Sequence, residues 1–135
     1  MLTPEQRRRV VRMFRLAAFL LIGLVAHGHA GDLARIESQE INYLITSIET
    51  LDNARFVRNG TAYDAKTAAG HLRLKLRNAG SRIRTAEDFI RYCASVSSIT
   101  GTPYQIRFSD GRVVTSEAFL RLKLADYRDH KNKGV

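Results

Sequence analysis

Cysteine and tryptophan are nearly absent from this chain of 135 residues, which has one cysteine, Cys93, and no tryptophan. A single thiol cannot form an intramolecular disulfide, so the chain is not a disulfide-stapled miniprotein. Phe89, Cys93 and Val96 follow the i, i+4, i+7 spacing of one helix face, which predicts a buried thiol. A reactive thiol or an intermolecular disulfide is the alternative interpretation of Cys93.

A long apolar run is also lacking. The uncharged run at residues 16–26 is shorter than the roughly 20 residues that a membrane-spanning helix needs. Five arginines precede this run, and Gly28-His29-Ala30 follows it with small residues where a signal peptidase cleaves. We therefore predict that residues 1–30 are a cleaved signal peptide, with an uncleaved anchor as the alternative. No cysteine lies near residue 30, which argues against a bacterial lipoprotein anchor.

Acidic residues are few, with 13 Asp and Glu against 22 Lys and Arg and a net charge of +9. Residues 1–30 hold five arginines and Glu5, so the remaining chain has 17 basic and 12 acidic residues and a net charge of +5. Six of these bases occur in one stretch with no acid among them, which predicts an anion-binding surface or, alternatively, the solvated face of an amphipathic helix. They are Lys66, Arg73, Lys75, Arg77, Arg82 and Arg84.

Apolar spacing and capping residues predict two helices in the first half of the remaining chain. Apolar residues recur with a period near 3.6 from Leu33 to Leu51, after a capping residue at Asp32. Asp64 caps a second predicted helix, which runs to about Asn78 and is closed by Gly80.

Extended structure is predicted in two places. Residues 55–63 break the helical period, and Asn59-Gly60 predicts a turn within a short extended arm or hairpin. Residues 104–108 and 112–115 are β-prone and flank Asp110-Gly111, which is typical of a hairpin.

Two further helices are predicted in the second half of the chain. Thr85 begins a capping-box pattern that starts a helix running to about Ser97. Thr115 or Ser116 caps a last helix, whose apolar positions continue to Tyr127.

These elements predict an α+β fold that is mostly helical, with about four helices and one short β-hairpin in a single compact domain. The length and the hydrophobic content of 44% exclude a multidomain protein and a disordered one. We expect the domain to cover residues 31–127 and a flexible basic tail to cover residues 128–135.

Four segments resemble, in order and at compatible spacing, successive motifs of the YfeK-like family of small exported bacterial proteins. They are residues 56–60 (FVRNG), 71–76 (HLRLKL), 85–90 (TAEDFI) and 97–104 (SSITGTPY). The resemblance covers most of the chain after residue 30 and implies a periplasmic bacterial protein. The family is one of unknown function, so the resemblance implies no mechanism.

One group of residues predicts an anion site. His71 and Lys75 lie one helical turn apart, and both would face Arg58 and Asn59 if the turn folds back over their helix. Arginine, amide and turn N–H groups are the donors that a bound carboxylate or phosphate needs. The alternative is structural, with Arg58 and Asn59 tying the turn to helix ends and His71 acting as a hydrogen-bonded structural residue.

Hydroxyl groups gather at Ser97-Ser98 and Thr100-Gly101, which predicts a ligand loop or, alternatively, hydroxyls that satisfy backbone groups at a helix end. The residue types of a nucleophilic triad are also present. They are His71, Ser98 and either Asp64 or Asp88. No nucleophile elbow, phosphate loop or paired metal-ligand motif accompanies them, so we expect no catalytic residues, no metal and no cofactor.

We therefore predict a small periplasmic binding or interaction protein that presents a basic face to an anionic cell-envelope ligand or partner protein. Two alternatives are a small periplasmic hydrolase using His71 and a serine, and an inhibitor of a cell-wall lytic enzyme, although a basic surface repels a basic lysozyme. Export and the lack of a recognition motif argue against nucleic acid. The predicted contact residues are Arg58, Asn59, His71, Arg73, Lys75, Ser98 and Tyr104.

Overall fold

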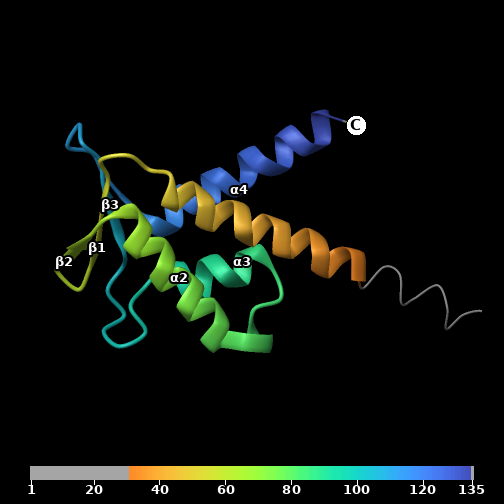
Figure 1. The fold of residues 1–135 in the computed structure, drawn as a ribbon, viewed down its shortest axis with the longest axis horizontal. Helices are drawn as coiled ribbons and strands as arrows, with labels where there is room; N and C mark the ends of the chain where they lie inside the picture. Colours follow the sequence, from red (N-terminus) through yellow and green to blue (C-terminus); the bar gives the residue numbers. More distant parts are fainter. Residues whose placement is uncertain (1–30, 135) are drawn as a thin grey trace, which may run out of the picture. The chain divides into compact units, whose positions relative to one another are not determined.

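The structure, a computed structural model, describes residues 31–134 (Figure 1). The chain divides into two units, residues 1–35 and residues 36–135, which are described separately below. The predicted signal peptide, residues 1–30, lies outside the described residues.

Within the first unit, residues 31–35 are helical. The side chain of Asp32 accepts a hydrogen bond from Arg35 at 3.2 Å, one turn later in the chain. Because residue 31 is already helical, Asp32 lies inside the helix rather than at its N-cap, and the cap predicted there is wrong.

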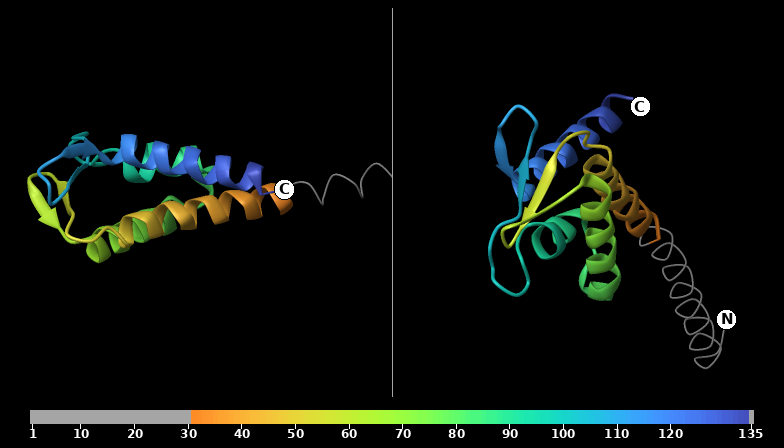
Figure 2. Two further views of the ribbon diagram at one scale, coloured as in Figure 1. Left: turned by 90° about the horizontal axis from the view of Figure 1, so that it is seen from above. Right: turned by 60° about the vertical axis from the view of Figure 1, so that its left-hand side comes forward.

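The second unit is mostly helical, with one small sheet, which confirms the predicted α+β class. Figure 2 shows the sheet at one end of the helices. The helical segments are residues 36–49, α2 (Ala65–Ala79), the 3₁₀-helix η1 (Gly80–Arg82), α3 (Ala86–Phe89), the π-helix η2 (Ile90–Ala94) and α4 (Ser116–Lys133). The strands are β1 (Arg55–Arg58), β2 (Thr61–Tyr63), β3 (Gln105–Arg107) and β4 (Val113–Thr115).

The sheet has four antiparallel strands in the order β2-β1-β3-β4, which corrects the prediction of one short hairpin. The hairpin β3-β4 is the predicted one, and β1-β2 forms around Asn59 and Gly60, whose φ angles are 49° and 79°. Pairing of Phe56 with Ile106 joins the two hairpins. Both side chains are buried, so the joined strands place one apolar row against the helices.

Side-chain caps fix the starts of α2, α3 and α4, as the sequence predicts. Asp64 accepts a hydrogen bond from the backbone N–H of Thr67 at 2.7 Å and begins α2. Thr85 and Asp88 form a reciprocal capping box at the start of α3. Thr115 caps α4, so Thr115 rather than Ser116 is the cap of the last helix. Each bond satisfies a backbone donor that the first turn leaves free.

The third predicted helix differs from expectation in its second half. Instead of running as an α-helix to about Ser97, it changes at Ile90 into the π-helix η2. The hydroxyl of Ser95 donates to the carbonyl of Ile90 at 2.6 Å, which helps to close this wider turn. Cys93 is buried as predicted, but Val96 is 37% exposed, because the π-helix breaks the spacing that would carry Val96 into the core.

Helix α4 extends beyond its predicted end near Tyr127 and continues to Lys133. Arg128 lies in this extension and binds two carboxylates, those of Glu40 and Glu87. Residues 128–133 are therefore helical, which corrects the predicted start of the tail at residue 128. These partners are distant in sequence, so the apolar period alone does not reveal them.

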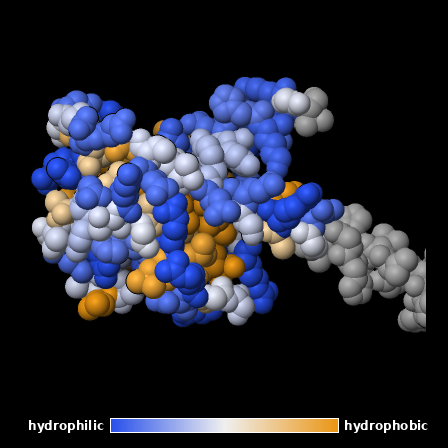
Figure 3. Space-filling view, viewed as in Figure 1, coloured by the Kyte–Doolittle hydropathy of each residue, from blue (hydrophilic) through white to orange (hydrophobic). Residues whose placement is uncertain are grey.

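The core lies between the helices and one face of the sheet. Figure 3 shows mainly hydrophilic surface on the face it displays, with an apolar area beside α2. Among the described residues, no helix has the length and apolar character to cross a membrane. The largest fully buried side chains are Phe89, Leu44, Ile48, Ile90, Ile106, Leu120, Cys93 and Ser97.

Candidate anion-binding site

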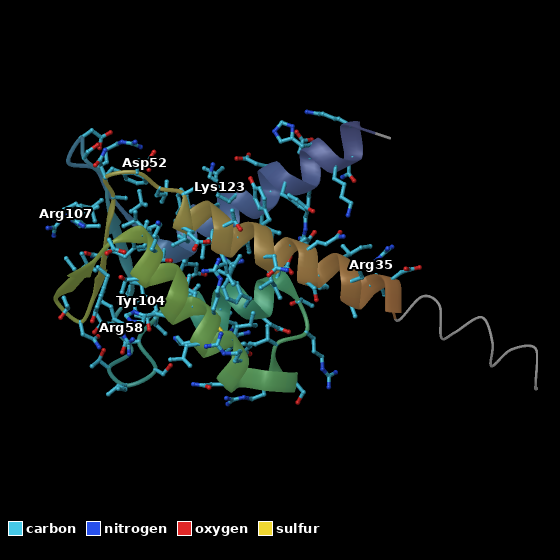
Figure 4. All side chains as sticks on the ribbon, viewed as in Figure 1. Arg35, Asp52, Arg58, Tyr104, Arg107 and Lys123 are labelled. Atoms are coloured by element: carbon cyan, nitrogen blue, oxygen red, sulfur yellow. The ribbon has the colours of Figure 1, made fainter. Side chains whose placement is uncertain are left out.

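A small surface cavity brings together four of the predicted contact residues. It lies where β1, α2 and the residue preceding β3 meet, and its volume is about 40 Å³. Figure 4 shows Arg58 and Tyr104 close together at this end of the protein. The four residues are Arg58, His71, Lys75 and Tyr104, and the other lining residues are Phe56, Val57, Tyr63, Ala68, Leu72 and Ser116.

We call Arg58, Lys75 and Tyr104 together the cavity site. Tyr104 lies at its centre. The ammonium of Lys75 lies 3.2 Å from the Tyr104 hydroxyl and 5.1 Å from the ring centroid. The Arg58 guanidinium lies 6.0 Å from the same centroid. Cations are attracted to an aromatic ring by its quadrupole, so one tyrosine lies within reach of two positive charges that line the same cavity.

The backbone on both sides of Tyr104 is fixed. Its N–H donates to the carbonyl of Ser95, and its carbonyl accepts from the N–H of Ser116, both at 2.9 Å. The ammonium of Lys75 also donates to the carbonyl of Val96 at 3.2 Å. The cavity site is therefore tied to α2, α4 and the segment after η2, and it does not depend on a single flexible loop.

His71 lies one turn before Lys75 on α2 and is half-buried. Its ring meets Tyr63 of β2 edge to face, with centroids 4.9 Å apart and planes at 80°. This geometry packs β2 against α2. His71 lines the cavity, and its aromatic contact also supports the structural interpretation of this residue.

Asn59 holds the turn between β1 and β2 onto the loop that follows η2. Its amide donates to the hydroxyl of Ser97 at 3.1 Å and accepts from the hydroxyl of Thr100 at 2.8 Å. Both ends of the amide are thus engaged within the protein. Ser97 also accepts weaker bonds from the N–H groups of Ile99 and Thr100, both at 3.4 Å. The hydroxyls of this loop therefore satisfy local polar groups, as the structural alternative expects.

Arg73 lies away from the cavity. It forms two hydrogen bonds to Glu49, Nη1 to Oε1 at 3.0 Å and Nη2 to Oε2 at 2.5 Å. The hydrogen bond from Arg73 holds the pKa of the Glu49 carboxyl below its usual value. This paired arginine connects α2 to the helix at residues 36–49, and its charge is compensated.

Ser98 lies outside the cavity and lines an adjoining groove, which consists of two neighbouring depressions of about 200 Å³ and about 770 Å³. Lys75 lines both the cavity and the smaller depression. Sequence reasoning missed Tyr92, which lines both depressions; its position just before the buried Cys93, off the apolar face, was the available signal. The groove is lined by Lys75, Asn78, Ala79, Ser81, Arg82, Ile83, Arg84, Tyr92, Cys93 and Ser98.

Positive charge is uncompensated along the cavity and the groove, since no Asp or Glu among the described residues lines either of them. Arg58, Lys75, Arg82 and Arg84 form no ion pair within the part of the chain that the structure describes. Asp88, four residues after Arg84, accepts from the backbone N–H of Arg84, which lowers the pKa of Asp88. This face can therefore attract an anion.

The residues of the predicted triad do not form one site, because two of them line different depressions and the two aspartates cap helices. His71 lines the cavity, whereas Ser98 lines the groove. Asp64 and Asp88 cap α2 and α3. No three His, Cys, Asp or Glu side chains within residues 31–134 form a group that could hold a metal ion.

Comparison with known proteins confirms the resemblance to the YfeK-like family. The uncharacterised protein YfeK of Salmonella typhimurium is 48% identical over 68 residues, which cover 50% of this chain and 57% of that protein. No solved structure matches the chain significantly. The family of unknown function DUF5329 matches residues 35–128, which include the cavity and the groove. The chain therefore belongs to the DUF5329 family.

Proposed function

We propose that this protein is a periplasmic binding module that recognises an anionic group on a component of the bacterial cell envelope. The observation that carries the proposal is the cavity site, where Arg58 and Lys75 both lie beside the Tyr104 ring and no carboxylate of residues 31–134 lines the cavity. Charge-assisted hydrogen bonds from such donors are stronger than neutral ones. A carboxylate or a phosphate would supply the missing negative charge.

The size of the cavity limits what enters it. Its volume of about 40 Å³ is far below the roughly 300–1,000 Å³ of a small-molecule pocket. We therefore propose that the ligand presents one anionic group to the cavity site while the rest of it remains outside. A polymer or a larger molecule of the envelope fits this description.

The proposed location rests on the export signal predicted at residues 1–30 and on the bacterial relative. To test the location, the full chain would be expressed with its own N-terminus in a Gram-negative bacterium. Its release by osmotic shock, together with the mass of its N-terminus, would then be measured. Retention in the cytoplasm with an intact N-terminus would contradict the proposed compartment.

The binding test is cosedimentation of the purified protein with a washed envelope fraction at ionic strengths of about 0.01 M and about 1 M. We expect Arg58→Ala with Lys75→Ala to weaken binding by about tenfold or more at low salt, because two charge-assisted contacts are lost. Arg107→Ala with Lys123→Ala is the matched control, since it removes equal charge outside the cavity and the groove. The site would be disproved if both double variants weakened envelope binding equally, or if Arg58→Ala with Lys75→Ala did not weaken it.

A further inference from the structure

The groove beside the cavity site offers a larger surface than the cavity itself. Its two depressions share Ala79, Arg82, Tyr92 and Ser98 among their lining residues. Lys75 joins the smaller depression to the cavity. A ligand held by Lys75 can therefore continue along the groove toward Arg84 without crossing a carboxylate.

Two arginines give the groove its charge. The Nε of Arg82 donates to the carbonyl of Ala79 at 3.3 Å, which anchors the base of this guanidinium. Arg84 follows the end of η1 and lines the larger depression. Neither arginine forms an ion pair within residues 31–134. A second anionic group would thus meet free donors at a point separate from the cavity site.

Tyr92 adds an exposed aromatic ring, with 54% of its surface accessible. The guanidinium of Arg91 lies 5.2 Å from its centroid. Ser81 and Ser98 contribute hydroxyls to the same depression. An apolar ring surface beside hydroxyl donors suits a sugar ring, whose C–H face packs on an aromatic ring while its hydroxyls form hydrogen bonds.

We propose that the groove binds an acidic polysaccharide chain, with one acidic group at the cavity site and the following sugars along Tyr92 and Arg82. This inference rests on the proposed function, because the cavity site supplies the first contact. Single-stranded nucleic acid fits less well, since it requires successive aromatic platforms and, within residues 31–134, Tyr92 is the only aromatic residue that lines the groove.

The test uses oligogalacturonates of increasing length with the full-chain protein and measures dissociation constants by calorimetry. We expect affinity to rise with length until the groove is filled, because each further acidic sugar meets a new contact. Arg82→Ala with Arg84→Ala should remove this rise and leave the affinity for the shortest oligomer unchanged. No rise with length in the wild-type protein would overturn the inference, even if the cavity site binds the shortest oligomer.

Further variants separate the inference from the proposed function. Arg58→Ala with Lys75→Ala should weaken the shortest oligomer about tenfold, and failure of this effect would contradict the cavity site itself. Tyr92→Ala should weaken long oligomers and leave polyphosphate binding unchanged. If polyphosphate of equal charge binds as tightly as the oligogalacturonate and Tyr92→Ala changes neither, the groove is a general polyanion surface and the polysaccharide inference fails.

Discussion

Arg128 of α4 donates two hydrogen bonds to Glu40, from Nε to Oε1 at 3.0 Å and from Nη2 to Oε2 at 2.6 Å. The Glu40 side chain is only 5% exposed, while that of Arg128 is 40% exposed. The remaining nitrogen of the guanidinium binds Glu87 at 2.5 Å. One arginine therefore joins α4, α3 and the helix at residues 36–49, and it compensates a carboxylate that lies inside the protein.

Removing this arginine should destabilise the fold more than removing an exposed one. Arg128→Ala leaves Glu40 buried without its partner, and we expect a loss of about 2–3 kcal/mol in the free energy of unfolding, at or below the low end for buried pairs because Arg128 is partly exposed. Arg121→Ala breaks only the exposed pair with Glu117 and should cost roughly 0.3–0.5 kcal/mol. Urea unfolding of both variants measures the difference, and equal midpoints would contradict it.

Stability should fall in acid partly through Glu87. The hydrogen bond from Arg128 lowers the pKa of Glu87 from its ordinary value of 4.5. The folded state thus binds this proton less readily than the unfolded state, so the contribution is complete above about pH 4.5 and is lost as the pH falls through the lower folded-state pKa. Glu87→Gln should flatten the decrease in urea midpoint between about pH 5 and pH 3. Asp52→Asn serves as the control; an equal flattening there would refute this assignment.

Cys93 should react slowly in the native protein. Burial raises the pKa of its thiol, although Lys75 and Arg82 act in the opposite direction, and the residue is 1% exposed. The thiolate is the reactive form, so both burial and the raised pKa slow alkylation. We expect iodoacetamide labelling at about pH 8 to follow unfolding as urea is added. Rapid labelling without urea would show an accessible thiol.

Two glycines should respond in opposite directions to alanine. Gly60 has a φ of +79°, so Gly60→Ala places a side chain in a strained conformation and should cost about 1 kcal/mol or more. Gly70 lies inside α2, and a Cβ there meets nothing within 4 Å, so Gly70→Ala should stabilise by about 0.8–1 kcal/mol. Thermal unfolding of the two variants checks the signs, and a shift of both in the same direction would contradict the backbone assignment.

Local signals explain what the sequence predicts well. The caps at Asp64, Thr85 and Thr115 and the turn at Asn59-Gly60 depend on residues within one turn of each other, and all appear in the structure. The pairing of β1 with β3 joins segments that are distant along the chain, so the sequence alone predicts two separate extended segments rather than a four-stranded sheet.

In the candidate site, too, contacts within one element are predictable from the sequence and contacts between distant elements are not. His71 and Lys75 share a helix face, so their common place in the cavity follows from local spacing. The sequence places Arg73 among the predicted ligand contacts, but Arg73 pairs with Glu49 on another helix, a contact that no local pattern reveals. The position of Tyr92 beside the buried Cys93 indicates its exposure, but no local pattern indicates that it shares a depression with Ser98, which lies beyond the π-helix.

The π-helix Ile90–Ala94 makes the groove sensitive to chain length. A π-turn accommodates one residue more than an α-helical turn, so deleting one residue there would restore regular α-helical bonding. Because the wider turn absorbs the extra residue, the deletion would keep the flanking segments in register but would change which residue stands at each position of the turn. Tyr92 and Ser98 would then no longer line the same depression. A one-residue difference in this segment between relatives would therefore mark whether the groove is retained, even where every lining residue is the same.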